Sequence, residues 1–166
     1  MFNEMMVAGS GGGGSVGLDM NSLIPNMTSA TTPSGVVTTS SNNSSYQAYY
    51  AFSSSQSYGW CTASYSYSND WIQYEFPTAT LAKAAQIVGA MGNGTQNKTC
   101  KFSVKASNDS TFANPVTLVE DVVYNTNTPS GFVLLNNVGT YKYYRFTIYD
   151  SNFNSGCVGL KAALFS

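Results

Sequence analysis

From about residue 34 onward, hydrophobic and polar residues alternate along the chain with a period of two. Ile72, Tyr74 and Phe76 share one face of a short segment, and residues 101–106 and 144–149 alternate in the same way. This period is typical of strands with one buried face and one solvated face. In the latter two segments the residues predicted to point inward are Phe102, Val104, Ala106, Tyr144, Phe146 and Ile148.

Further short hydrophobic runs are separated by clusters of Gly, Asn, Asp and Ser, which favour turns. The additional predicted strands are 85–91, 116–124, 132–135 and 158–165. No segment has a helical period of useful length, and residues 79–86 are expected to form at most a short turn. Many short strands at this spacing predict an all-β fold, an antiparallel β-sandwich or jelly roll.

Residues 1–33 differ from the rest, because glycines interrupt a series of exposed-looking apolar side chains. We expect residues 1–33 to be an extended N-terminal arm that anchors the protein, and residues 34–166 to be the folded domain. Such an arm orders on its own domain or on a neighbouring chain; the alternative is a disordered leader. The predicted partner-binding residues are Phe2, Met5, Met6, Val7, Leu18, Met20, Leu23 and Ile24.

The small number of charged residues excludes several classes of function. The 166 residues include 7 basic and 8 acidic side chains and no histidine. Binding to nucleic acid needs clustered Lys and Arg, which this chain lacks. The absence of histidine removes the commonest catalytic base and metal ligand, so neither an enzyme nor a metal centre is expected. The adjacent Glu120 and Asp121 would point to opposite faces of a strand and would not converge on a substrate.

The remaining sequence features concern location and cysteines. No apolar run approaches the roughly 18 residues of a membrane-spanning helix, so no membrane insertion is expected. The N-terminus has neither the basic nor the apolar region of a signal peptide. Cys61, Cys100 and Cys157 are too few and too irregular for zinc. They are either three small buried residues or one disulfide and a free thiol.

Six segments in order resemble the discoidin family (coagulation factor type C, or galactose-binding-like, domains). The segments are 49–52 (YYAF), 60–62 (WCT), 71–76 (WIQYEF), 105–110 (KASNDS), 141–146 (YKYYRF) and 158–165 (VGLKAALF). The resemblance covers about residues 34–166 and implies a galactose-binding-like sandwich. Family members carry Asp-Gly after Ala-Phe in a structural calcium loop, whereas Ser53, Ser54 and Ser55 follow Phe52 here. Losing that carboxylate weakens a calcium site without excluding one made from carbonyl oxygens, and we expect no cofactor.

The resemblance also implies that loops at one end of the sandwich bind the ligand, by stacking aromatic rings on sugars and by hydrogen bonds from amides. The predicted ligand-binding residues are Tyr58, Tyr65, Tyr67, Asn93, Asn97, Phe153 and Asn154. Arg145 is expected to be a structural partner of Asp70, Glu75 or Asp150. Trp60 and Trp71 are expected in the core.

Together, a Gly-rich arm and a polar sandwich without a signal sequence resemble small virion proteins of tailed bacteriophages. We therefore expect a non-enzymatic structural or decoration protein, made in the host cytoplasm and located on the virion. The arm would bind other virion subunits in a multi-copy or homo-oligomeric assembly, and the outer loops would hold a cell-surface glycan. The alternative is a free or secreted carbohydrate-binding module with no role in assembly.

Overall fold

The protein is described here from a computed structural model. The structure describes residues 21–56, 59–63, 69–89, 99–125, 131–149 and 159–166. Its elements are β1 (Val36–Thr39), a 3-10 helix η1 (Ala48–Phe52), β2 (Trp60–Cys61), β3 (Asp70–Leu81), β4 (Ala84–Gly89), β5 (Thr99–Ser107), β6 (Val116–Asn125), β7 (Val133–Leu134), β8 (Thr140–Tyr149) and β9 (Gly159–Phe165). No helix within these ranges is long and apolar enough to cross a membrane.

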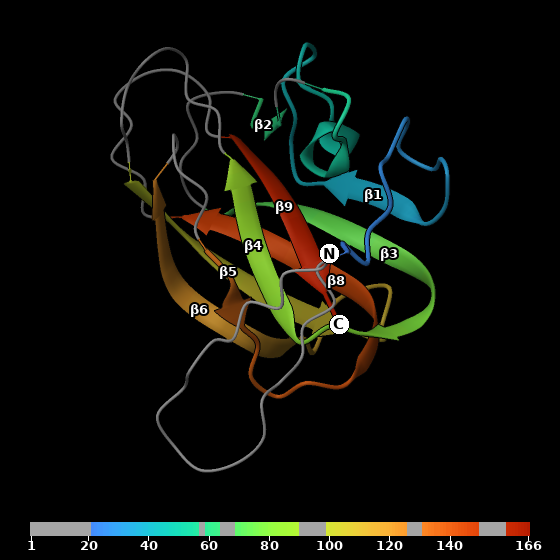
Figure 1. The fold of residues 1–166 in the computed structure, drawn as a ribbon, viewed down its shortest axis with the longest axis vertical. Helices are drawn as coiled ribbons and strands as arrows, with labels where there is room; N and C mark the ends of the chain where they lie inside the picture. The colour runs from blue at the N-terminus through green and yellow to red at the C-terminus, as the bar shows by residue number, and fades with distance from the viewer. Residues whose placement is uncertain (1–20, 57–58, 64–68, 90–98, 126–130, 150–158) are drawn as a thin grey trace, which may run out of the picture.

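The strands form two antiparallel sheets packed face to face (Figure 1). One sheet has five strands in the order β1-β3-β8-β5-β6, and the other has four in the order β2-β9-β4-β7. The predicted all-β antiparallel sandwich is therefore confirmed. All the longer predicted strands are present, and the structure adds β1 and β2, whose four and two residues were not predicted as strands.

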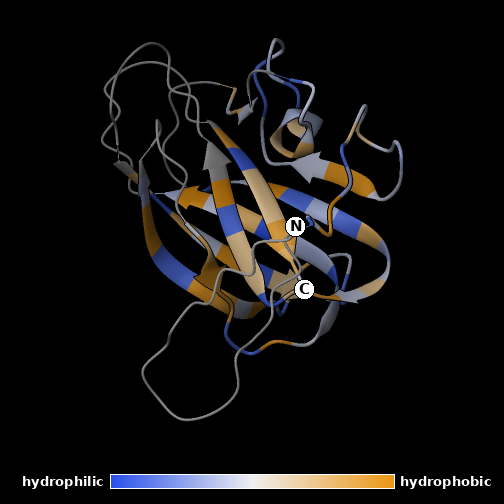
Figure 2. Ribbon diagram, viewed as in Figure 1, coloured by the Kyte–Doolittle hydropathy of each residue, from blue (hydrophilic) through white to orange (hydrophobic). Residues whose placement is uncertain are grey.

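The inward residues of the alternating strands form the core between the sheets. Ile72 and Tyr74 of β3 and Phe146 of β8 are fully buried, and Figure 2 shows alternating hydrophobic and hydrophilic bands along these strands. Burying each such side chain contributes about 1.5–3 kcal/mol. Rings from the larger sheet also meet edge to face, with centroids 4.7 Å apart for Tyr74 and Phe76 and 5.6 Å apart for Phe76 and Tyr144.

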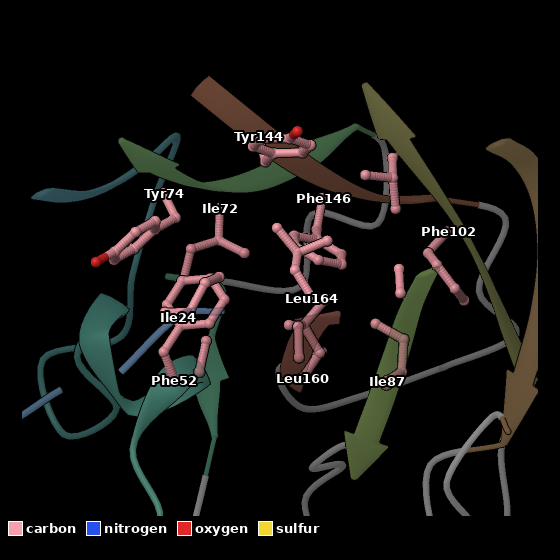
Figure 3. Packing of buried hydrophobic residues seen from close by; sticks show 14 of the residues in the cluster. Ile24, Phe52, Ile72, Tyr74, Ile87, Phe102, Tyr144, Phe146, Leu160 and Leu164 are labelled. Atoms are coloured by element: carbon pink, nitrogen blue, oxygen red, sulfur yellow. The ribbon is translucent and has the colours of Figure 1, made fainter. Parts of the chain in front are cut away.

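The segment 21–33, the described part of the region predicted to be an arm, packs on its own domain. Ile24 and Met27 are only 4% and 0% exposed, and Figure 3 shows Ile24 on the same side of the core as Phe52. The amide of Leu23 donates to Leu164 O at 2.7 Å, and that of Met27 to Phe52 O at 3.0 Å. Leu23 and Ile24 are therefore not free to bind a partner, because the domain uses them itself.

The other residues predicted to bind a partner, Phe2, Met5, Met6, Val7, Leu18 and Met20, lie outside the described residues.

Of the two cysteines within the described residues, one is disulfide-bonded and one is free. Cys61 lies on β2, is fully buried and is disulfide-bonded. Cys100 is a free thiol on β5, 1% exposed, and its burial raises the pKa of the thiol to about 11. This arrangement agrees with the second of the two alternatives drawn from the sequence. Trp60, next to Cys61, is fully buried as expected and donates its indole N–H to Ser41 O at 2.8 Å.

Candidate functional site

The strand ends that flank most of the predicted ligand-binding residues lie at one end of the sandwich. Asp70 at the start of β3 pairs with Ile148 near the end of β8, and Lys101 near the start of β5 pairs with Tyr149. In the other sheet, Cys61 pairs with Gly159 at the start of β9. Within each sheet, the strand ends that flank residues 62–69, 90–98 and 150–158 are therefore hydrogen-bonded neighbours. Residues that follow neighbouring strand ends can contribute to one site.

None of the residues predicted to bind the ligand is among the described residues. Tyr58, Tyr65, Tyr67, Asn93, Asn97, Phe153 and Asn154 all lie outside the described residues. Their roles stay predictions.

A second site-like feature lies within the described residues, on the outer face of the five-stranded sheet. It is a groove of about 530 Å³, which falls in the size range of small-ligand sites. Thr147 of β8 and Ser103 of β5, which are paired neighbours, provide small hydroxyl-bearing side chains in its lining. Its other lining residues are Asn69, Trp71, Lys105, Phe112, Pro115, Glu120, Asp121, Arg145 and Tyr149.

Arg145 in this groove is held between two aromatic rings. Its guanidinium carbon lies 3.9 Å from the ring centroid of Trp71 and 3.8 Å from that of Phe112. Its Nε and Nη2 donate to Gln73 Oε1 at 3.1 and 2.9 Å. Burial lowers the pKa of Arg145, although the group stays charged at any physiological pH.

The surroundings of Arg145 and Trp71 differ from the prediction made for each residue. Arg145 forms no ion pair with Asp70 or Glu75; Asp150 lies outside the described residues. Glu75 instead bonds Lys142, at 2.9 Å, and Asp70 accepts from two serine hydroxyls. Trp71 is only partly buried, because the alternation that turns Ile72 inward turns Trp71 outward. The expectation that Trp71 is a core residue was wrong.

A β-bulge in β6 brings Glu120 and Asp121 to the same groove. Val119 pairs with Val104 and Val122 with Phe102, so Glu120 and Asp121 both lie opposite the single residue Ser103. Asp121 has φ +57°, which breaks the regular alternation. The prediction that the two carboxylates diverge was therefore wrong.

The hydroxyl of Tyr149 forms two hydrogen bonds with Asp121 in this bulge. The amide of Asp121 donates to Tyr149 Oη at 2.7 Å, and the hydroxyl donates to Asp121 Oδ1 at 2.9 Å. Burial is the largest cause of the raised pKa of Tyr149. Glu120 has a different partner, Lys105 Nζ at 3.2 Å. Both carboxylates are thus already engaged within the protein.

The loop after Phe52, where the resemblance to discoidin domains implies a calcium site, is held here by side chains. Asn26 Oδ1 accepts from the amide of Ser54 at 2.7 Å, and the ammonium of Lys161 donates to Gln56 O. A cation bound beside this ammonium would be repelled. In the part of the chain that the structure describes, no three His, Cys, Asp or Glu side chains are grouped so as to hold a metal ion.

The comparisons with known proteins agree with this fold. No protein-family model matches the sequence, and no curated protein matches it. Among solved structures, chitosan-binding module 1 of a chitosanase/glucanase from Paenibacillus sp. IK-5 superposes with a TM-score of 0.66. It is 16% identical, and the match covers 88% of this chain and 99% of the module. At this identity the likeness establishes the fold.

Two further structures extend the comparison. CpGH89CBM32-5 from Clostridium perfringens, in complex with GalNAc-β-1,3-galactose, has a TM-score of 0.63 at 14% identity, over 80% of this chain and 95% of that one. A putative α-L-fucosidase from Bacteroides thetaiotaomicron has a TM-score of 0.64 at 12% identity, over 88% of this chain but only 28% of the enzyme. The chain therefore has the fold of CBM32-like carbohydrate-binding modules, which also occur within enzymes.

Proposed function

We propose that this protein is a non-catalytic carbohydrate-binding module that binds a glycan through the loops at the end of the sandwich where β3 begins and β8 ends. The observation that supports the proposal is that the strand ends flanking residues 62–69, 90–98 and 150–158 are neighbours within the two sheets. These loops are rich in Tyr, Asn and Ser, which suit the CH faces and hydroxyls of neutral sugars.

The fold supports this choice over other classes of function. The similar modules are described as binding chitosan or GalNAc-β-1,3-galactose. Because these ligands differ in chemistry, the fold does not name the sugar, and specificity resides in the loop side chains. The proposal is the alternative weighed from the sequence, the free or secreted module, and it replaces the virion protein as the preferred function.

A glycan array tests this proposal. Wild-type protein should bind a subset of neutral glycans. Tyr65→Ala and Tyr67→Ala should each weaken binding by about fivefold or more, since stacking a ring on a sugar contributes roughly 1 kcal/mol or more. Val138→Ala, which shortens an exposed side chain between β7 and β8, is the matched control and should bind as wild type does. Absence of binding to every glycan, with the fold intact by circular dichroism, would contradict the proposal.

Attachment to a phage particle stays a separate prediction from the sequence. None of the three similar structures described above is a virion protein. The disulfide at Cys61 supports a location outside the reducing cytoplasm, which a secreted module and a released virion share. Deleting residues 1–20 separates the two: loss of particle incorporation with glycan binding retained would support the virion role, and unchanged incorporation would exclude anchoring by this segment.

A further inference from the structure

We propose that the groove on the outer face of the five-stranded sheet is a second ligand site, and that it binds the carboxylate of an acidic saccharide, such as a uronic acid. This inference does not depend on the loop end of the sandwich. It rests on Arg145, on the row of residues across β3, β8 and β5 that contains it, and on the hydroxyl and aromatic groups around it.

Arg145 has no counter-ion among the described residues, although it lies in a partly buried place. Trp71 and Phe112 cover both faces of the guanidinium, so only its edge can contact a ligand. Of its five N–H groups, two donate to Gln73, which leaves three for an acceptor in the groove. A rigid guanidinium edge matches a carboxylate, which accepts two parallel hydrogen bonds.

The same row of the sheet places a second cation directly beside the first. Gln73 pairs with Arg145 across β3 and β8, and Arg145 pairs with Lys105 across β8 and β5. Like charges directly opposite each other on neighbouring strands destabilise a sheet. Glu120 lies 3.2 Å from Lys105 and offsets its charge, while Arg145 has no anionic partner among the residues that the structure describes. A bound carboxylate would supply it.

The rest of the groove suits a sugar ring. Thr147 and Ser103 bring hydroxyl groups to the middle strands, and Trp71 and Tyr149 bring aromatic rings to the lining. Sugars combine hydroxyls with apolar CH faces, so a carboxylate at Arg145 would place the ring over matching groups. Asp121, which also lines the groove, accepts a hydrogen bond from Tyr149, and no ion pair joins it to Arg145 among the described residues.

The experiment titrates the full chain with tri-galacturonate and with its fully methyl-esterified, neutral form at low ionic strength, by calorimetry. The acid form should bind and the ester should not, and salt should weaken the binding. Binding of the acid form should also change the tryptophan fluorescence of the protein. Because Trp60 is fully buried, this change should come from Trp71 and should disappear in Trp71→Phe.

Two groove variants and one control locate the binding. Arg145→Gln should weaken it by about tenfold or more, since a charge-assisted hydrogen bond contributes about 1.5–3 kcal/mol. If Arg145→Gln lowers the melting temperature too far for use, Thr147→Tyr, which fills the groove from a partly exposed position, takes its place. Lys83→Gln removes the same charge from the strand connection at β4 and should bind as wild type does.

Several results would overturn the proposal. They are no binding of tri-galacturonate, equal binding of its ester, equal binding of a hexaglutamate peptide, or a loss with Lys83→Gln as large as that with Arg145→Gln. Tyr65→Ala and Tyr67→Ala separate this site from the proposed function. They should leave uronate binding in the groove unchanged, and the groove variants should leave neutral-glycan binding unchanged, so either site can fail alone.

Discussion

A chain that begins at Ser34 should not form a stable domain, whereas one that begins at Asn21 should. The difference between the two is the segment 21–33, which the sequence pattern assigns to an arm and the structure places against the core. Its removal exposes the space filled by Ile24 and Met27. It also removes the hydrogen bonds that the amides of Leu23 and Met27 donate to Leu164 O and Phe52 O.

The loss can be worked from these contacts. Truncating a buried Ile or Met to Ala costs about 2–5 kcal/mol. Ile24 and Met27 together therefore account for roughly 4–10 kcal/mol before the two backbone hydrogen bonds, each about 0.5–1.5 kcal/mol, are added. Domains of this size have a total free energy of unfolding of about 5–15 kcal/mol. Removing the segment should thus cancel most of the stability.

Urea denaturation followed by circular dichroism measures the effect on both chains. Ile24→Ala and Met27→Ala, made singly, should each lower the midpoint, whereas Thr28→Ala should not, because its side chain is exposed. If the chain from Ser34 unfolded at the same urea concentration as the chain from Asn21, the segment would contribute nothing and the reasoning from burial would be wrong.

Two further predictions concern Lys161 and Cys100. Lys161→Met should lower the free energy of unfolding by about 1.5–3 kcal/mol, because Gln56 O loses a charged donor. Calcium should not raise the melting temperature of the wild-type protein. A clear rise would show that the Lys161 ammonium does not exclude the ion. Cys100, with its pKa raised from 9.0 to about 11, should resist thiol reagents at pH 8 until the protein unfolds. Because the folded state holds the Cys100 proton more tightly than the unfolded state, the free energy of unfolding should fall as the pH rises from about 9 to 11. The fall should be smaller in Cys100→Ala. An equal fall in both proteins would refute this prediction.

The strand pattern was readable from the sequence wherever a strand was long enough. Ile72, Tyr74 and Phe76 point inward as their spacing indicates, because one face of each sheet packs on the other. Ile24 was misassigned because a segment without regular structure can fill a core without any period. Nothing in single-strand alternation predicts that Glu120 and Asp121 share a side, since a bulge depends on how two strands pair.

The outer groove could have been found from the sequence in part. Trp71, Gln73, Lys105 and Arg145 all occupy the outward positions of strands that the pattern predicts. Their register across three strands was the missing information, because pairs such as Arg145 and Lys105 become neighbours only when β8 and β5 align. Phe112 was beyond reach, since it comes to Arg145 from the turn region between β5 and β6.

The bulge in β6 also affects how copies of the domain meet. In the described part of the larger sheet, β6 is an edge strand, and a regular edge of ten residues would offer a template for a strand of another molecule. The left-handed turn of the backbone at Asp121 interrupts that template, and the exposed carboxylate of Glu120 adds a charge beside it. Both features disfavour the pairing of this edge, including the exposed Val123 two residues further on, with a strand of another copy.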